Sequence, residues 1–474
     1  MTYVPLLILA GGALLVLLVG AAMAYNRIRG ESAKPLSLGI HYSWVIVAVL
    51  AVVQIFGGSI FFVAGIMVAP LSDEGGDFGW GLGTISVAFA LYYLFSAIYA
   101  PISGHLGDRF GARRMMLAGI VMYGLGMVSL GFVSHVWQFF LVYSVFMAAT
   151  ASITMVPLMA SITGWFRHRL GLGIGILWAV GGIGTAVLAP LIAYLLDNLG
   201  WRDTFLTLGI AGAGIMLLAW PFIRSKPADI GIEPYGTDES APKPVLMSAA
   251  VMKLRLKVFN QHMRRTHAFW DLPLIHALGC AGHGIVLIYV VPLAVEQGIG
   301  LATAALTISI LSLVSIISRL GSPILAEIYS PRKLMAASLL IQGLTVPMLF
   351  VAHDPWVFYL FAVTFGFGFG GEWTSYLEMN RRYFGDGPMG SCYGWQMTGA
   401  MMGHAVTTAL AGLVIIATGS FYPVFALSAA FSLTGVWVIA NLDSTSQVLI
   451  PHWEEELPPE AQTPGLSAQA AGDS

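Results

Sequence analysis

The hydrophobic pattern of the chain consists of long apolar runs separated by short polar segments. A run of about 17–25 apolar residues is long enough to cross a membrane as a helix, and a helix satisfies its backbone hydrogen bonds within one span. The pattern therefore predicts twelve membrane-spanning helices. They lie at residues 43–71, 81–104, 115–133, 137–163, 170–196, 203–223, 270–295, 302–326, 333–352, 355–380, 391–417 and 421–442.

A further apolar run at 4–25 precedes these twelve and is followed by Arg27, Arg29 and Lys34. Because basic residues mark the cytoplasmic side, this order favours a retained extra helix within residues 1–30, with its N-terminus outside. Two alternatives stay open. The run ends in AAMA, which resembles a signal-peptidase site, and a translation start placed too far upstream would also add such a segment.

Basic residues in the rest of the chain follow every second predicted helix, whereas the opposite loops contain only Arg202 among Lys and Arg. This asymmetry predicts that both ends of the twelve-helix core are cytoplasmic. It also divides the chain into four parts. These are an N-terminal six-helix bundle at 40–223, a polar, basic linker at 224–268, a C-terminal bundle at 269–442, and a tail at 443–474 that is expected to be disordered.

Composition agrees with a membrane protein. Apolar residues make up 57% of the chain, charged residues only 10%, and the mean hydropathy is +0.80, whereas soluble domains carry about 25% charged residues. The net charge of −2 and the dispersed basic residues favour no nucleic-acid partner. The two cysteines, Cys280 and Cys392, form no disulfide framework and no CxxC motif. We expect a monomer in the lipid bilayer, with no cofactor, no metal and no enzymatic site.

An internal repeat links the two halves. GHLGDRFGARRM at 104–115 aligns without gaps with PILAEIYSPRKL at 323–334, so that Asp108 matches Glu327 and each carboxylate precedes a basic pair. Two similar halves around a central linker are typical of transporter folds.

The first copy resembles the loop signature GxLxDRxGxRR of the major facilitator superfamily. The resemblance implies an all-α membrane fold of two six-helix bundles related by a pseudo-two-fold axis. It also implies a cytoplasmic gate in which the signature latches the two halves together. The alternative is that these charges only set the membrane topology. The second copy is degenerate, with Pro323, Ile328 and Ser330 at signature positions. The implied gate residues are Gly104, Asp108, Arg109, Gly111, Arg113, Arg114 and Glu327.

Three further segments indicate which branch of the superfamily the chain resembles. FGWGLGTISVAFALYY at 78–93, GWFRHRLGLGIGI at 164–176 and GWRDTF at 200–205 are similar to bacterial monocarboxylate transporters and oxalate–formate antiporters. The branch places an arginine on its eighth helix that binds the substrate carboxylate, which corresponds here to Arg319. Animal members add an aspartate four residues earlier, where this chain has Ser315, and a lysine in the first helix, which this chain lacks.

Ionisable residues deep in a span are functional candidates by default. Arg319 lies roughly 12 Å from the end of its helix, and Glu372 lies at a similar depth. A guanidinium suits a carboxylate ligand because it grips both oxygens. The alternative is an internal Arg319–Glu372 ion pair. The full set of predicted substrate-binding residues is Arg319, Glu372, His283, Tyr92, Tyr93, Gln54, Gln396 and His404.

Proton coupling is a separate question, for which Glu372 is the first candidate and His276 and His283 follow. A histidine in a membrane helix can instead make only one interhelical hydrogen bond. The sequence thus predicts a secondary transporter of the bacterial cytoplasmic membrane that moves a small mono- or dicarboxylate by alternating access. Alternatives are an exporter of amphipathic or uncharged compounds and a membrane sensor that does not transport.

Overall fold

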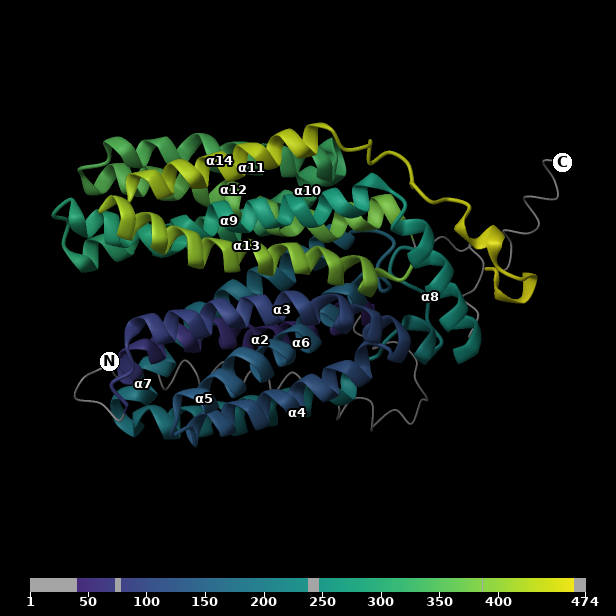
Figure 1. Cartoon of the computed structure of the whole chain (residues 1–474). Coiled ribbons are helices and arrows are strands. Elements are labelled where there is room, and N and C mark those ends of the chain that lie inside the picture. The colour runs from purple at the N-terminus through teal and green to yellow at the C-terminus, as the bar shows by residue number, and fades with distance from the viewer. Residues whose placement is uncertain (1–40, 73–77, 238–246, 386, 464–474) are drawn as a thin grey trace.

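The computed structural model describes residues 41–72, 78–237, 247–385 and 387–463. The leading run at 4–25 lies outside them. Figure 1 shows two helical bundles side by side, one formed by α2 to α7 and the other by α9 to α14, with α8 at one end. The helices of the first bundle are α2 Tyr42–Ser72, α3 Leu82–Phe110, α4 Ala112–Gly131, α5 Val136–Phe139, η1 Phe140–Met147, α6 Ala148–Ile162 and α7 Leu170–Ala219. The linker helix is α8 Ala249–Met263, and the second bundle comprises α9 His267–Glu296, α10 Leu301–Tyr329, α11 Pro331–Thr345, η4 Val346–Val351, α12 Pro355–Phe384, α13 Met389–Thr418 and α14 Tyr422–Ala440.

Each of the twelve predicted spans corresponds to helix in this structure. By length and composition, nine helical stretches among the described residues are long and apolar enough to cross a membrane. The predicted spans 170–196 and 203–223 form the continuous element α7, which is interrupted at Gly200 with φ 76° and ψ 171°. Glycine tolerates this conformation, so the chain turns there between two spans.

The repeat predicted from the sequence forms the same turn twice, at the end of α3 and at the end of α10. Gly111 connects α3 to α4 with φ 83°, and Ser330 connects α10 to α11 with φ 113°. A serine at φ 113° and ψ 144° lies in a region that is populated mainly by glycine and is strained by roughly 1–3 kcal/mol. The Ser330 hydroxyl partly offsets this cost because it accepts a hydrogen bond from the Lys333 N–H at 3.3 Å and caps α11.

The two bundles meet at the end that carries these turns, which we call the basic end because the basic loops and α8 lie there. Close approaches of backbone to backbone join α3 and α13. A Cβ added at Gly104 would overlap the carbonyl of Gly390, and one added at Gly394 would lie 2.7 Å from the Ala100 oxygen. On the other side of the interface, a Cβ at Gly171 would lie 2.8 Å from Pro323 of α10. Glycines therefore allow the halves to close tightly at the basic end.

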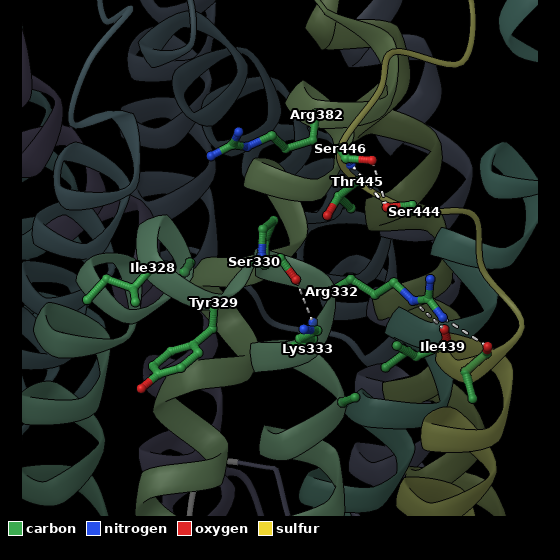
Figure 2. A pocket seen from close by; sticks show the side chains of 14 residues that line it. Ile328, Tyr329, Ser330, Arg332, Lys333, Arg382, Ile439, Ser444, Thr445 and Ser446 are labelled. Atoms are coloured by element: carbon green, nitrogen blue, oxygen red, sulfur yellow. Dashed lines mark hydrogen bonds between the residues drawn. The ribbon is translucent and has the colours of Figure 1, made fainter.

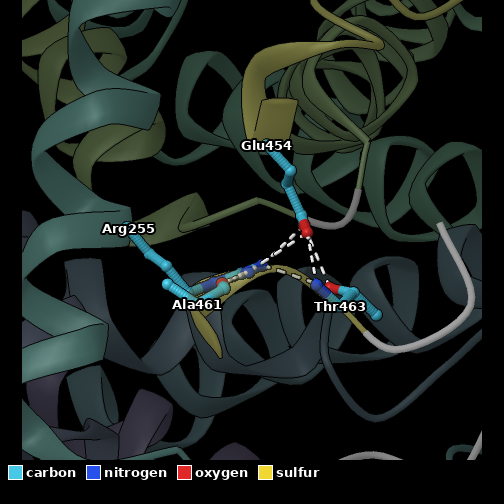
Figure 3. Close-up of polar contacts among 4 residues, drawn as sticks. All are labelled: Arg255, Glu454, Ala461 and Thr463. Atoms are coloured by element: carbon cyan, nitrogen blue, oxygen red, sulfur yellow. Dashed lines mark hydrogen bonds and ion pairs between the residues drawn. The ribbon is translucent and has the colours of Figure 1, made fainter. Parts of the chain in front are cut away.

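The tail differs from the sequence prediction. Up to residue 463 it is packed against the linker helix, where Trp453 and Leu457 are buried beside Phe259 of α8. Figure 3 shows the polar part of this contact, in which Arg255 donates to both Glu454 oxygens at 2.6 and 3.1 Å. The expectation of a disordered tail is therefore wrong for residues 443–463, because its few apolar residues bury against α8. Residues 464–474 lie outside the described residues.

Candidate functional site

Arg319 lies at the boundary between the two halves. It is on α10, its side chain is only 8% exposed, and its Nη1 donates to the Trp178 carbonyl of α7 at 2.9 Å. The guanidinium also lies 5.4 Å from the ring centre of Phe369. Its Nε has no hydrogen-bond partner among the described residues. The buried cation is thus bonded to a neutral carbonyl and retains an unused donor.

Glu372 has different partners from those that the sequence suggested. Its carboxylate is fully buried and is bonded by His283 Nδ1 at 3.2 Å, Gln342 Nε2 at 2.7 Å and the Tyr376 hydroxyl at 2.5 Å. A carboxylate accepts several donors in this way. Among the described residues it forms no ion pair with Arg319. The neutralising Arg319–Glu372 pair is therefore absent in this conformation.

Aromatic rings separate the two charged groups. The Phe369 ring has Arg319 on one side and the His283 ring at 4.9 Å. Trp178 and Trp373 meet across the boundary between the halves, with ring centres 4.5 Å apart. The centre of the molecule therefore combines one buried cation with a largely aromatic surround, which suits a small ligand that carries both an anionic and an apolar part.

The predicted histidines gather around this centre. His276 stacks on Tyr376 with ring centres 3.6 Å apart, and the His283 and His404 rings are 5.6 Å apart. The His404 ring, on α13, also stacks on Tyr93 of α3 at 5.1 Å. Of the predicted tyrosines, Tyr93 therefore joins the histidine group across the boundary between the halves.

The remaining predicted polar residues lie elsewhere. Tyr92 stacks within the N-terminal half on Tyr143 at 5.0 Å. Gln54 is buried against Gly181 of α7. Gln396 accepts a hydrogen bond from Asn380 on α12. Ser315, which replaces the aspartate of the animal transporters, bonds the Ser312 carbonyl of its own helix at 2.9 Å.

The predicted gate makes its contact between the halves through Asp108. Its two oxygens accept the backbone N–H groups of Gly390 at 2.8 Å and Ser391 at 2.6 Å, at the N-terminus of α13. The described contacts of the signature arginines stay within the N-terminal half, since Arg109 lies over Phe110 and Arg113 over Trp220.

The other predicted gate residues that the structure describes lie around this contact. Gly104 forms the close approach to α13 and Gly111 forms the turn into α4, while Arg114 is exposed. The side chain of Glu327 lies outside the described side chains. The carboxylate at the helix N-terminus is therefore the part of the signature that joins the halves in this conformation.

A cavity of about 510 Å³ lies at the basic end of the C-terminal half (Figure 2). Its lining includes the basic side chains of Arg332, Lys333 and Arg382. Arg332 is bonded to the carbonyls of Ile439 and Ala440. None of the central residues lines this cavity, so it is separate from the site around Arg319.

Sequence reasoning missed several central residues. Tyr376 follows Glu372 by four positions, so helical spacing places it on the same face. Gln342 is a polar residue within an otherwise apolar stretch of α11. Gln54 was predicted as a site residue on the same kind of pattern. The Trp178 carbonyl carries no sequence signal, because any residue has one. Cys280 was not predicted as a site residue, because the two cysteines of the chain form no CxxC motif.

Two helical bundles that meet over a buried, incompletely paired cation are an arrangement typical of membrane transporters. The family model of the Major Facilitator Superfamily matches residues 50–328 and 322–465. The chain belongs to this superfamily.

Individual relatives agree with this assignment. Monocarboxylate transporter 2 of Homo sapiens is 23% identical over 384 residues, covering 78% of this chain and 80% of that protein. Multidrug resistance protein MdtG of Dickeya zeae is 28% identical, covering 57% and 62%. Among solved structures, the proton:xylose symporter XylE aligns with a TM-score of 0.68 at 12% identity, covering 85% of this chain and 96% of that one. The structural likeness supports the fold.

Proposed function

We propose that the protein transports a small organic anion, a mono- or dicarboxylate, by alternating access of its two halves. The observation that carries the proposal is the bonding of Arg319, a buried cation whose described polar partner is the neutral Trp178 carbonyl. Burying a charge without a counter-charge is costly, and a carboxylate would supply one. Similarity to monocarboxylate transporters supports the same substrate class.

The bond to Trp178 also suggests how binding and movement are linked. Arg319 belongs to the C-terminal half and Trp178 to the N-terminal half, so this hydrogen bond exists only while the halves are close. A carboxylate that binds the Arg319 guanidinium would compete with the Trp178 carbonyl for its N–H donors. Charge-assisted bonds are stronger than those to a neutral acceptor, so the anion would favour rearrangement of the boundary between the halves.

The test is a thermal-shift screen of the purified protein against mono- and dicarboxylates, followed by uptake into liposomes. A ligand that binds only the folded protein raises its melting temperature. We expect Arg319→Ala to lose both the shift and the uptake. Arg332→Ala is the matched control, because Arg332 also donates to carbonyls but lies at the basic end. Carboxylate uptake that is unchanged in Arg319→Ala would refute the anion-binding role.

Proton coupling is a finer part of the proposal. Glu372 and His283 are already bonded to one another, whereas the buried His276 has no hydrogen bond to another side chain among the described residues. We therefore place the proton-linked step on His276. His276→Gln should keep exchange of substrate across the membrane but lose accumulation driven by an imposed pH gradient. Gradient-driven accumulation at the normal level in this variant would remove His276 from the proposal.

A second candidate function is export of amphipathic compounds. Two observations favour it: the tryptophan pair Trp178–Trp373 at the centre and the similarity to multidrug resistance protein MdtG. The same screen separates the two functions. Uncharged amphipathic compounds that stabilise Arg319→Ala as well as the unmodified protein would favour export, while carboxylates that require Arg319 would favour the first proposal.

The proposal includes the location of the protein. The basic loops and α8 share one end of the bundles, and in membrane proteins such an end faces the cytoplasm. We place the chain in a bacterial cytoplasmic membrane with the basic end inside. Proteolysis of the α8 region in sealed vesicles of known orientation tests this, because only inside-out vesicles should expose it.

A further inference from the structure

Cys280, His283 and His404 form a cluster of potential metal ligands at the centre of the molecule. One ligand atom from each residue, the cysteine sulfur and a ring nitrogen of each histidine, lies within 4.8 Å of the other two. Cys280 and His283 are three residues apart on α9 and so share one helix face. A Cβ added at Gly284 would lie 3.4 Å from His404 Nδ1, so the His404 ring on α13 faces α9.

The hydrogen bond to His283 orients its ring as in a metal site. Histidines that bind metals usually bond their second ring nitrogen to a carboxylate, a backbone carbonyl or water, which fixes the ring and leaves the other nitrogen for the metal. His283 Nδ1 is bonded to Glu372, and its Nε2 is buried without a hydrogen-bond partner among the described residues. The His283 side chain is only 1% exposed. A buried nitrogen without a partner is costly in the absence of a ligand.

Glu372 is itself held in place. Gln342 and Tyr376 donate to its carboxylate in addition to His283. No alanine could replace Gly279 without displacing this carboxylate, because an added Cβ would overlap its Oε1. The carboxylate that orients His283 is therefore rigid.

We propose that Cys280, His283 and His404 bind a soft metal ion, Zn²⁺ or Cu⁺, with Glu372 as the residue that positions His283. Thiolate and imidazole donors select these ions over Mg²⁺ or Ca²⁺. In a tetrahedral zinc site the ligand atoms are roughly 3.3–3.8 Å apart, so the ligand atoms, now within 4.8 Å of one another, would approach by at most about 1–1.5 Å. Three protein ligands leave the fourth position for water or a small anion. This inference does not depend on the proposed transport of carboxylates.

The site would tie α9 to α13, and α13 carries the contact between the halves through His404 and Tyr93. Bound metal would therefore stiffen the C-terminal half at the surface that faces the N-terminal half. The sequence does not show the site, because it lacks both CxxC and HxxxH spacing and the ligands come from two helices that are distant in the chain.

The test uses the full-length protein in detergent, purified with a tag that contains no histidine and stripped with a chelator. We expect Zn²⁺ to bind one ion per chain and to raise the melting temperature. Co²⁺ in the same site should show the visible absorption of a cobalt–thiolate bond. Cys280→Ser and His404→Gln should lose both signals. Cys392→Ser is the matched control, because Cys392 is also a buried cysteine but lies outside the cluster.

A second measurement needs no variant, so it does not depend on whether the variants fold. In the unmodified protein, Zn²⁺ should slow alkylation of Cys280 relative to Cys392, as read by mass spectrometry of the two peptides. Absence of a thiolate band with Co²⁺, or a zinc-induced shift that persists in Cys280→Ser, would overturn the proposal. Equal alkylation of both cysteines with and without Zn²⁺ would overturn it as well.

Discussion

Replacing Asp108 with asparagine tests whether this carboxylate holds the two halves together at the basic end. Asp108 accepts two backbone hydrogen bonds from the N-terminus of α13, at 2.8 and 2.6 Å. A hydrogen bond to a charged group contributes roughly 1.5–3 kcal/mol, and a carboxylate at a helix N-terminus gains about 0.3–1 kcal/mol more. Asparagine keeps one acceptor oxygen but turns an N–H donor toward the second backbone N–H.

The expected loss for the closed basic end is thus about 2–4 kcal/mol, which corresponds to about a 30- to 700-fold shift toward the open state. The assay is the alkylation rate of a cysteine placed at Ala97, in a background where Cys280 and Cys392 are serine. Ala97 is 2% exposed on α3, and its carbonyl accepts a bond from Thr398 of α13. Its labelling therefore requires the halves to separate.

The matched control is Asp229→Asn. Asp229 also accepts two backbone N–H groups, those of Ser225 and Lys226, both at 3.1 Å, but these contacts stay within the linker. The control should leave the labelling rate at Ala97→Cys unchanged. If Asp108→Asn changes this rate by less than twofold, the carboxylate does not hold the basic end closed and the reasoning fails.

Two further predictions concern the C-terminal half and the tail. Gly279→Ala should lower the free energy of unfolding by about 1–3 kcal/mol, because the added Cβ would overlap Glu372 Oε1. Thermal unfolding measures this loss. Gly58→Ala is the control, because a Cβ at Gly58 would meet nothing within 4 Å. An equal response of the two variants would count against a rigid Glu372. At Glu454, burial alone would raise the pKa, but the Arg255 guanidinium and the Thr463 N–H and hydroxyl hold the pKa below its ordinary value. Because this pKa is lowered, the contact stabilises the docked tail fully at pH values above the unfolded pKa of the carboxyl, about 4.3. This stabilisation is lost as the pH falls through the pKa of the folded state. Hydrogen exchange should therefore find the tail protected at neutral pH and released in acid, and Glu454→Gln should release it at both; tail protection that is independent of Glu454 would contradict this.

Much of the fold follows from the sequence because membrane spans impose a strong local pattern. Twelve apolar runs, the basic loops and the repeat around Asp108 determine the order of the helices and their ends. The turn at Gly111 could be expected from its glycine. The equivalent turn at Ser330 could not be inferred from residue type, because serine adopts positive φ only where a neighbouring contact supports it.

The central site was less predictable, since depth in a span does not tell which helices face each other. Arg319 and Glu372 lie at similar depth, yet the structure bonds one to Trp178 and the other to His283 and Gln342. These partners depend on how α10, α11 and α12 are rotated and on closure of the halves. The packed tail was missed for a related reason, because Trp453 finds its apolar surface only on α8.

The bond between Arg319 and a neutral carbonyl has an electrical consequence. Among the described residues no carboxylate is paired with this cation, and the Glu372 carboxylate at similar depth is bonded to His283 and separated from Arg319 by the Phe369 ring. A monocarboxylate bound at Arg319, as proposed above, would therefore make the charge at the centre of the protein more negative by one unit. Moving one charge through the membrane field costs about 2.3 kcal/mol per 100 mV. Reorientation of the loaded protein and return of the empty protein should therefore differ in their dependence on the membrane voltage by an amount that corresponds to one charge.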